Sequence, residues 1–157
     1  MADKPKKVDQ KKVVAKKELV FIDVNEDQFP NPTLAFVQEM LSALAVGDFG
    51  ILERGKEYVQ TIRGSNGFHL EQRETISIRP YRFEHRKAGR VEADVEAAIL
   101  ELEDFPDDPD DFLLGFSNEL LEVSEVMVLF ADFWHGLPRS EMFVWREFDF
   151  ESDTLEA

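Results

Sequence analysis

The chain has 157 residues and a formal net charge of −15, with 43% hydrophobic residues, fourteen phenylalanines and no cysteine. This length suits one domain with an ordinary core, and the hydrophobic content argues against a disordered acidic chain. The lack of cysteine excludes disulfides, thiolate metal sites and a cysteine nucleophile, and the charge disfavours nucleic acid and anionic lipid as partners of the body.

Residues 1–17 form a basic head with seven lysines against two aspartates and almost no large apolar side chain. This composition predicts a disordered tail without the apolar core of a signal peptide. No apolar run approaches the roughly 18–20 residues that cross a membrane. We therefore expect a soluble cytoplasmic protein with a single domain at 18–150 and a frayed tail at 151–157.

The first part of the domain predicts a short strand and a helix. Residues 19–22 are an apolar run of the kind that forms a strand. Asn31 is a candidate N-cap, and Pro32 suits the first helical position. Apolar residues then recur every three or four positions until Gly47, which indicates an amphipathic helix that packs on a sheet.

Residues 49–84 predict an antiparallel meander. Residues 57–63 are rich in β-branched and aromatic side chains, and the segment 64–67 reads Gly-Ser-Asn-Gly, a turn. The chain then returns through 68–73 and continues as a further strand over 76–83. Pro80 predicts that this last strand lies at an edge or carries a bulge.

The second half predicts two more helices and a closing strand. Apolar spacing indicates helices over 91–105 and from Ser124, a candidate N-cap, to Gly136. Residues 106–111 break the pattern, and 142–150 alternate as a strand. The fold class is therefore α+β, with an antiparallel meander of about four to six strands packed by about three amphipathic helices.

Strand alternation gathers polar side chains on one face of the 57–73 hairpin. If Ser65 and Asn66 form the turn, Tyr58 lies opposite Arg73 and Gln60 lies opposite Glu71. If Asn66 and Gly67 form it, the register shifts by two residues and Gln60 lies opposite Arg73. Cross-strand polar pairs contribute only about 0.2–1 kcal/mol each. The face is thus either a solvated polar network or a recognition site. Its members are Tyr58, Gln60, His69, Glu71 and Arg73.

Motifs for chemistry are few. His69 and Glu71 could begin a metal site, but such a site needs three or four convergent ligands, and we predict none. Residues 107–111 lack the central glycine and terminal glutamate of an EF-hand loop. The chain contains no Gly-rich phosphate loop and no serine elbow. We therefore predict no catalytic residue, no cofactor and no enzymatic activity.

Charge is layered within the body. Residues 54–90 carry nine Lys and Arg against four Glu, whereas 91–157 carry two Arg against twenty acids. One interpretation is a basic sheet face balanced by acidic helices. The other is an acidic surface that steers a basic protein partner. The candidate partner-binding residues are Asp107, Asp108, Asp110, Asp111 and Glu119.

Several short motifs fall in the range 50–150. They are Tyr58-Val59-Gln60-Thr61, the run from Gly67 to Arg73, a Ser124-capped helix ending in Gly136, and Phe143-Val144-Trp145. In these the chain resembles uncharacterised bacterial proteins and immunity proteins encoded beside polymorphic toxins. The resemblance implies a non-catalytic cytosolic protein that binds and blocks a toxin, and it assigns no functional residue.

Two other functions stay open from the sequence. The hairpin face could serve a small-ligand-binding or catalytic module, which would require a pocket over that face. The protein could instead be a structural or assembly subunit that dimerises through the Pro80 strand or through an aromatic cluster. That cluster contains Phe130, Phe133, Trp134, Phe143 and Trp145.

Overall fold

The structure is a computed structural model, and it describes residues 18–101 and 113–148. The elements of the first half are β1 (Leu19–Ile22), β2 (Gln28–Pro30), α2 (Leu34–Ser42), β3 (Phe49–Arg54), β4 (Glu57–Gly64), β5 (Gly67–Ile78) and β6 (Tyr81–Arg90). The second half contains β7 (Ala97–Leu100), β8 (Leu113–Phe116), the 3₁₀ turn η2 (Ser117–Glu119), α3 (Val123–Trp134) and β9 (Phe143–Phe148).

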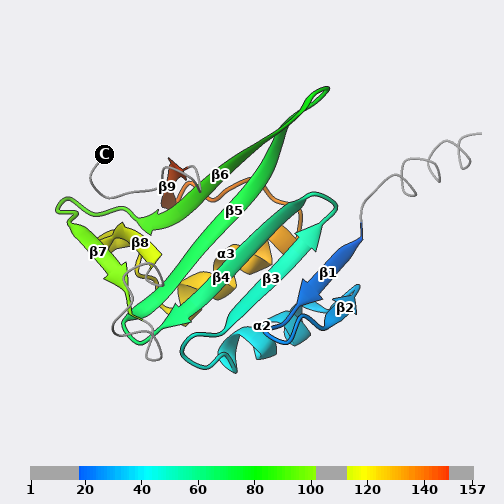
Figure 1. The fold of residues 1–157 in the computed structure, drawn as a ribbon, viewed down its shortest axis with the longest axis horizontal. Helices are drawn as coiled ribbons and strands as arrows, with labels where there is room; N and C mark the ends of the chain where they lie inside the picture. Colours follow the sequence, from blue (N-terminus) through cyan, green and yellow to red (C-terminus); the bar gives the residue numbers. More distant parts are fainter. Residues whose placement is uncertain (1–17, 102–112, 149–157) are drawn as a thin grey trace, which may run out of the picture.

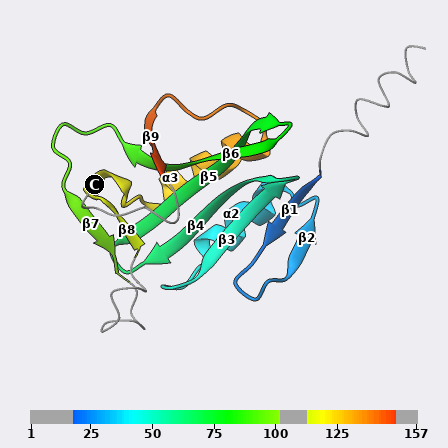
Figure 2. The same cartoon turned by 45° about the horizontal axis from the view of Figure 1, so that its top comes forward.

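Seven strands build one sheet in the order β2-β1-β3-β4-β5-β6-β9, and β7 and β8 pair separately. The antiparallel run from β3 to β6 is the predicted meander. Figure 1 looks onto one face of the sheet, with α2 and α3 behind it, and Figure 2 shows both helices on that same side. The sheet therefore has a helix-covered face and an opposite face, which we call the open face.

The hydrophobic core lies between the helices and the sheet. Alternation along the strands sends every second side chain to the helix-covered face, where apolar residues are buried. Fully burying one such side chain stabilises a fold by about 1.5–3 kcal/mol. The sheet contributes Phe21, Leu52, Val59 and Leu70, and the helices contribute Val37, Leu41, Val126, Leu129, Phe130 and Phe133.

Both helices begin at residues other than the predicted caps. Thr33 is the N-cap of α2, and its hydroxyl accepts a hydrogen bond from the backbone of the helix. Asn31 has a φ of 50° and lies in the bend before it. α3 begins earlier than Ser124, because Glu122 is its N-cap and donates its N–H to the Glu125 carboxylate at 2.9 Å. The helices themselves are where the periodicity predicts them.

The inner halves of β5 and β6 lie within the sheet, and their outer halves project beyond it as a hairpin arm, residues 75–84 (Figure 1). The strand predicted over 76–83 is wrong, because Pro80 lies in the turn between β5 and β6. Proline has no N–H to donate to a ladder, which makes a turn its natural place. The bulge lies in β5, between Thr75 and Ser77. The exposed apolar side chains of the arm are Ile76, Ile78 and Tyr81.

The helix predicted over 91–105 is wrong over its described part, 91–101. Ala97–Leu100 is strand β7, paired with β8, while Val91 and Val95 are 68% and 43% exposed. Leu100 packs closely on Gly64. A Cβ added at Gly64 would lie 2.6 Å from the Cγ atom of Leu100. The apolar spacing of so short a segment does not separate helix from strand, and the pairing partner lies beyond residue 112.

The α+β class and the antiparallel meander are confirmed, but the described residues contain two α-helices rather than three and a main sheet of seven strands rather than four to six. The predicted tails at 1–17 and 151–157 lie outside these residues. None of the described helices is long and apolar enough to cross a membrane.

Candidate functional site

The predicted hairpin face lies on the open face of the sheet. In the β4–β5 ladder Tyr58 pairs with Arg73 and Gln60 pairs with Glu71, which is the first of the two predicted registers. His69 lies on the same face, two residues before Glu71. The structure therefore brings the five predicted residues together on adjacent strands.

A row of alternating aromatic and cationic side chains runs along this face from the arm. The Arg73 guanidinium lies 4.8 Å from the centre of the Tyr58 ring and 4.5 Å from that of Phe83. Tyr81 stacks on Phe83 with centroids 5.9 Å apart, and the Lys56 ammonium lies 5.0 Å from the Tyr81 centroid. Contacts of this kind contribute about 0.5–1 kcal/mol each at exposed sites.

The row continues to the edge strand β9. His85 lies between Tyr58 and Phe148, with centroid distances of 6.4 and 5.9 Å, and the Lys87 ammonium lies 4.8 Å from the Phe148 centroid. We call this set of side chains the aromatic–cation row. In spatial order it contains Lys56, Tyr81, Phe83, Arg73, Tyr58, His85, Phe148 and Lys87. Its β6 members, Tyr81, Phe83, His85 and Lys87, are not among the residues predicted from the sequence. The signal for them is present in the sequence, because strand alternation over residues 81–87 places Tyr, Phe, His and Lys on one face.

Tyr58 is a hydrogen-bond donor at neutral pH. Burial raises the pKa of its hydroxyl well above the ordinary value, and the nearby Glu71 charge raises it further, while Arg73 acts in the opposite direction. The hydroxyl donates to Glu71 Oε2 at 3.4 Å. Tyr58 therefore fixes the Glu71 carboxylate rather than acting as a base.

One end of the open face is covered by β8 and η2. A Cβ on Gly115 would stand 2.8 Å from Glu119 Oε1 and 3.2 Å from the His69 ring atoms. At the next strand, a Cβ on Gly89 would stand 2.6 Å from the Asn118 amide nitrogen. His69 is only 5% exposed as a result. It is therefore a core residue under this cover, and it is inaccessible to a ligand on the open face.

Glu119 is an internal carboxylate. Arg146 donates to it through Nε at 2.8 Å and through Nη2 at 3.0 Å, and the Phe116 N–H donates at 3.0 Å. Only 3% of the residue is exposed. The carboxylate therefore holds η2 on β9. A partner-binding role would require it to lie on an exposed acidic surface, and it does not. The other predicted partner-binding residues, Asp107, Asp108, Asp110 and Asp111, lie outside the described residues.

A described acidic surface precedes β7. Glu92, Asp94 and Glu96 are exposed, and Val91 and Val95 alternate with them. These residues belong to neither a helix nor a strand. We call residues 91–96 the acidic strip. Its composition joins exposed apolar groups to negative charge, which is typical of a docking segment for a cationic surface.

The positive charge of residues 54–90 does not gather on one sheet face. Arg54 lies on the helix-covered side and donates to two carbonyls at the end of α3, at 2.8 and 3.1 Å. Arg63 donates to the Leu44 carbonyl beyond the end of α2. Arg90 forms a bidentate pair with Glu125. Much of this charge therefore closes helix ends and internal ion pairs, which disfavours the interpretation of residues 54–90 as one basic sheet face.

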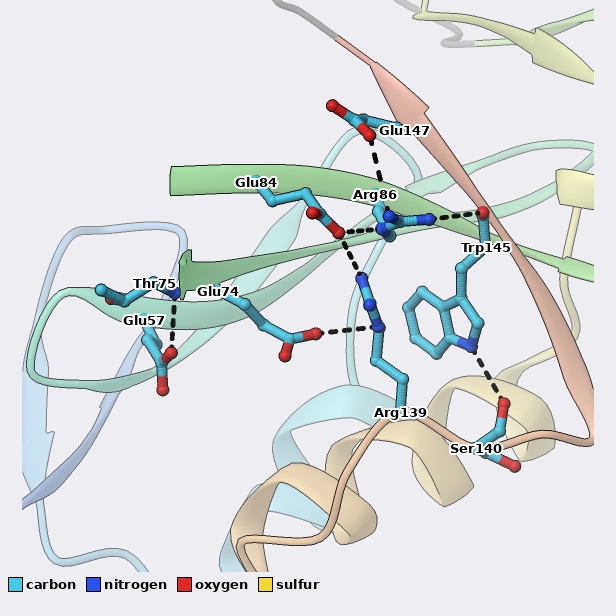
Figure 3. A network of polar contacts seen from close by, with 9 residues as sticks. All are labelled: Glu57, Glu74, Thr75, Glu84, Arg86, Arg139, Ser140, Trp145 and Glu147. Atoms are coloured by element: carbon cyan, nitrogen blue, oxygen red, sulfur yellow. Dashed lines mark hydrogen bonds and ion pairs between the residues drawn. The ribbon is translucent and has the colours of Figure 1, made fainter. Parts of the chain in front are cut away.

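A network of arginines and glutamates on the helix-covered face joins the base of the arm to the chain after α3 (Figure 3). Arg139 pairs with Glu74 at 2.9 Å and with Glu84 at 3.0 Å, and Arg86 bonds Glu84 and the Trp145 carbonyl. Burial raises the pKa of Glu74, whereas hydrogen bonds from Arg86 and Arg139 lower that of Glu84. Because arginine engages both carboxylates, we interpret the network as a structural clamp.

A hollow of about 410 Å³ lies where the β4–β5 turn, η2 and the start of α3 meet. No predicted site residue lines it. Arg63 and Arg90 do, and both are already bonded to the protein. The polar and charged lining comprises Arg63, Ser65, Asn66, Arg90, Ser117 and Glu122.

Within residues 18–101 and 113–148, no group of three or more histidines and carboxylates is arranged to hold a metal ion. Comparisons with protein-family models, with curated proteins and with solved structures give no match. Two surfaces of the described residues are candidates for binding, the aromatic–cation row and the acidic strip.

Proposed function

We propose that this chain is a non-catalytic cytosolic binding protein that takes a basic protein partner on its acidic strip. The observation that carries the proposal is the exposure of Val91, at 68%, and of Val95, at 43%, next to three exposed acids. Exposed valines supply apolar contact area, and the flanking carboxylates steer a cationic surface and fix its register. The sequence continues this acidity beyond β7 through residues 103–111.

The resemblance to immunity proteins supports a specific form of this function, in which the partner is a toxin that the complex blocks. A toxin that acts on nucleic acid needs a basic cleft to attract its substrate. An acidic strip complements such a cleft and would occupy it in place of the substrate. The proposed partner is therefore a basic protein encoded by a neighbouring gene.

The test mixes the purified full chain with the products of neighbouring genes and measures binding by calorimetry. The triple variant E92Q/D94N/E96Q should weaken the complex by at least about tenfold, since charge pairs at interfaces contribute strongly to affinity. The control E18Q/E26Q/E39Q changes the same charge at exposed positions of the β1–α2 region. It should leave the affinity nearly unchanged.

Two results would contradict the proposal. One is a complex whose affinity responds equally to the two triple variants, because the strip would then contribute only overall charge. The other is the absence of any complex at low salt, where charge steering is strongest. For the immunity form, co-expression with the partner should restore growth of cells that produce it, and the strip variant should fail to do so.

A further inference from the structure

Arg73 is a preorganised guanidinium on the open face. Its Nε donates to the Lys56 carbonyl at 2.7 Å, which fixes the direction of the side chain. The rings of Tyr58 and Phe83 lie at 4.8 and 4.5 Å and fix its plane. A planar group held in this way loses little conformational entropy when it binds an anion.

The charge of Arg73 has no counter-ion in the part of the chain that the structure describes. Three nearby arginines do have carboxylate partners. Arg86 and Arg139 pair with Glu84, and Arg90 pairs with Glu125. The contacts of Arg73 are one carbonyl and two rings, so its two terminal amino groups take part in no described hydrogen bond or ion pair. Two parallel N–H donors are the geometry that carboxylates and phosphates accept.

The surroundings of Arg73 define what else the ligand carries. His85 is its direct cross-strand neighbour, and the Lys56 ammonium lies on the arm side, above Tyr81. Tyr81 is 55% exposed and stacks on Phe83, and a flat group that packs on its ring displaces the exposed Lys56 side chain. Glu71 is the nearest acid along the same strand face, and it is engaged by the Tyr58 hydroxyl. A ligand therefore meets a fixed cation beside an aromatic platform.

From this arrangement we propose that the open face binds a small anion, in which a carboxylate or phosphate lies on the Arg73 guanidinium and an attached flat apolar group lies on Tyr81. The site differs from the acidic strip in position and in the sign of its charge, and it does not depend on the proposed function. The guanidinium fork of Arg73 and the ring of Tyr81 supply two directional contacts at the surface of the sheet.

The experiment titrates the full chain with four probes and follows binding by calorimetry and by amide shifts in NMR spectra. The probes are phenyl phosphate, benzoate, inorganic phosphate and phenol. Phenyl phosphate and benzoate should both bind, and the tighter of the two identifies the anion class. Inorganic phosphate should bind about tenfold more weakly, since it lacks the flat group, and phenol should not bind.

Four variants assign the binding to the two contacts. R73Q should abolish it, and R73K should weaken it by about tenfold, because lysine keeps the charge but loses the planar fork. Y81A should weaken phenyl phosphate binding and leave that of inorganic phosphate unchanged, an effect that general unfolding does not produce. R82Q is the matched control, since it removes an exposed arginine of the same arm and should change the affinity by less than about twofold.

The proposal is overturned if neither phenyl phosphate nor benzoate binds the wild-type chain at low salt. It is also overturned if R82Q weakens binding as much as R73Q, which would indicate general attraction to positive charge. Thermal unfolding of each variant accompanies the titrations. R73K with a wild-type melting temperature and wild-type affinity would equally contradict the role of the fork.

Discussion

Replacing Glu119 by glutamine tests the internal ion pair that fastens η2 to the edge of the sheet. The change keeps the shape of the side chain and removes its charge. In the wild type the carboxylate accepts two hydrogen bonds from Arg146 and one from the Phe116 backbone. A glutamine retains one accepting oxygen and directs an NH₂ group at a donor of the guanidinium.

The expected cost follows from burial. The Glu119 side chain is 4% exposed and that of Arg146 is 28% exposed. Removing one member of a fully buried pair costs about 3–5 kcal/mol. Since solvent reaches Arg146, we expect a smaller loss of about 2–3 kcal/mol in the free energy of unfolding. For a chain of this size that corresponds to a melting temperature lower by roughly 4–12 °C.

The assay is urea denaturation followed by circular dichroism, with equal m-values required for the comparison. E147Q is the matched control, because the Glu147 side chain is 66% exposed and lies 3.7 Å from Arg86 at the edge of the sheet. It should change the free energy of unfolding by less than about 0.5 kcal/mol. If E119Q is as stable as E147Q, the Glu119 carboxylate does not hold η2 on the sheet.

Three further changes test packing and electrostatics. G115A should destabilise the fold by about 1–3 kcal/mol in the same assay, because a Cβ at this position overlaps the Glu119 carboxylate. R54M should cost about 1–2 kcal/mol, because it removes the donor to the carbonyls at the end of α3, whereas R82M should be nearly neutral. For Glu84, hydrogen bonds from Arg86 and Arg139 lower the pKa below the ordinary 4.5, so its charged form stabilises the fold. The stability difference between wild type and E84Q should be present above pH 4.5 and should vanish as the pH falls through the lowered pKa; a difference that grows in acid would contradict this sign.

The predictable part of the fold is the part fixed by local rules. Residues 57–73 contain a turn bounded by two glycines and strands of alternating pattern, so both the strands and one of the two predicted registers agree with the structure. The helices at 34–42 and 123–134 carry apolar residues at helical spacing. The segment 91–101 was mispredicted because its structure depends on pairing with β8, a contact that periodicity does not reveal.

The candidate site was predicted only in part, for a similar reason. Alternation places Tyr58 and Arg73 on one face, and this follows from the hairpin alone. His69 is buried because β8 packs on its imidazole ring, and this close approach depends on the missing side chain of Gly115. That Glu119 is internal depends on Arg146, which lies 27 residues further along the chain. Charge counting treats such carboxylates as surface groups, because it contains no information on pairing in space.

The two proposed surfaces should be separable by salt. Arg73 lies opposite His85 in the β5–β6 ladder, and the acidic strip begins after Arg90. Five residues of β6 therefore separate Arg73 from the start of the strip, a distance of about 17 Å along the strand. The Debye length is about 8 Å at 0.15 M salt and about 30 Å at 0.01 M. E92Q/D94N/E96Q should therefore leave the affinity for phenyl phosphate unchanged at 0.15 M and increase it at 0.01 M, because the three negative charges are screened from the anion at the higher salt concentration and repel it at the lower one. An increase of equal size at both salt concentrations would mean that the strip contacts the anion site directly, which this geometry excludes.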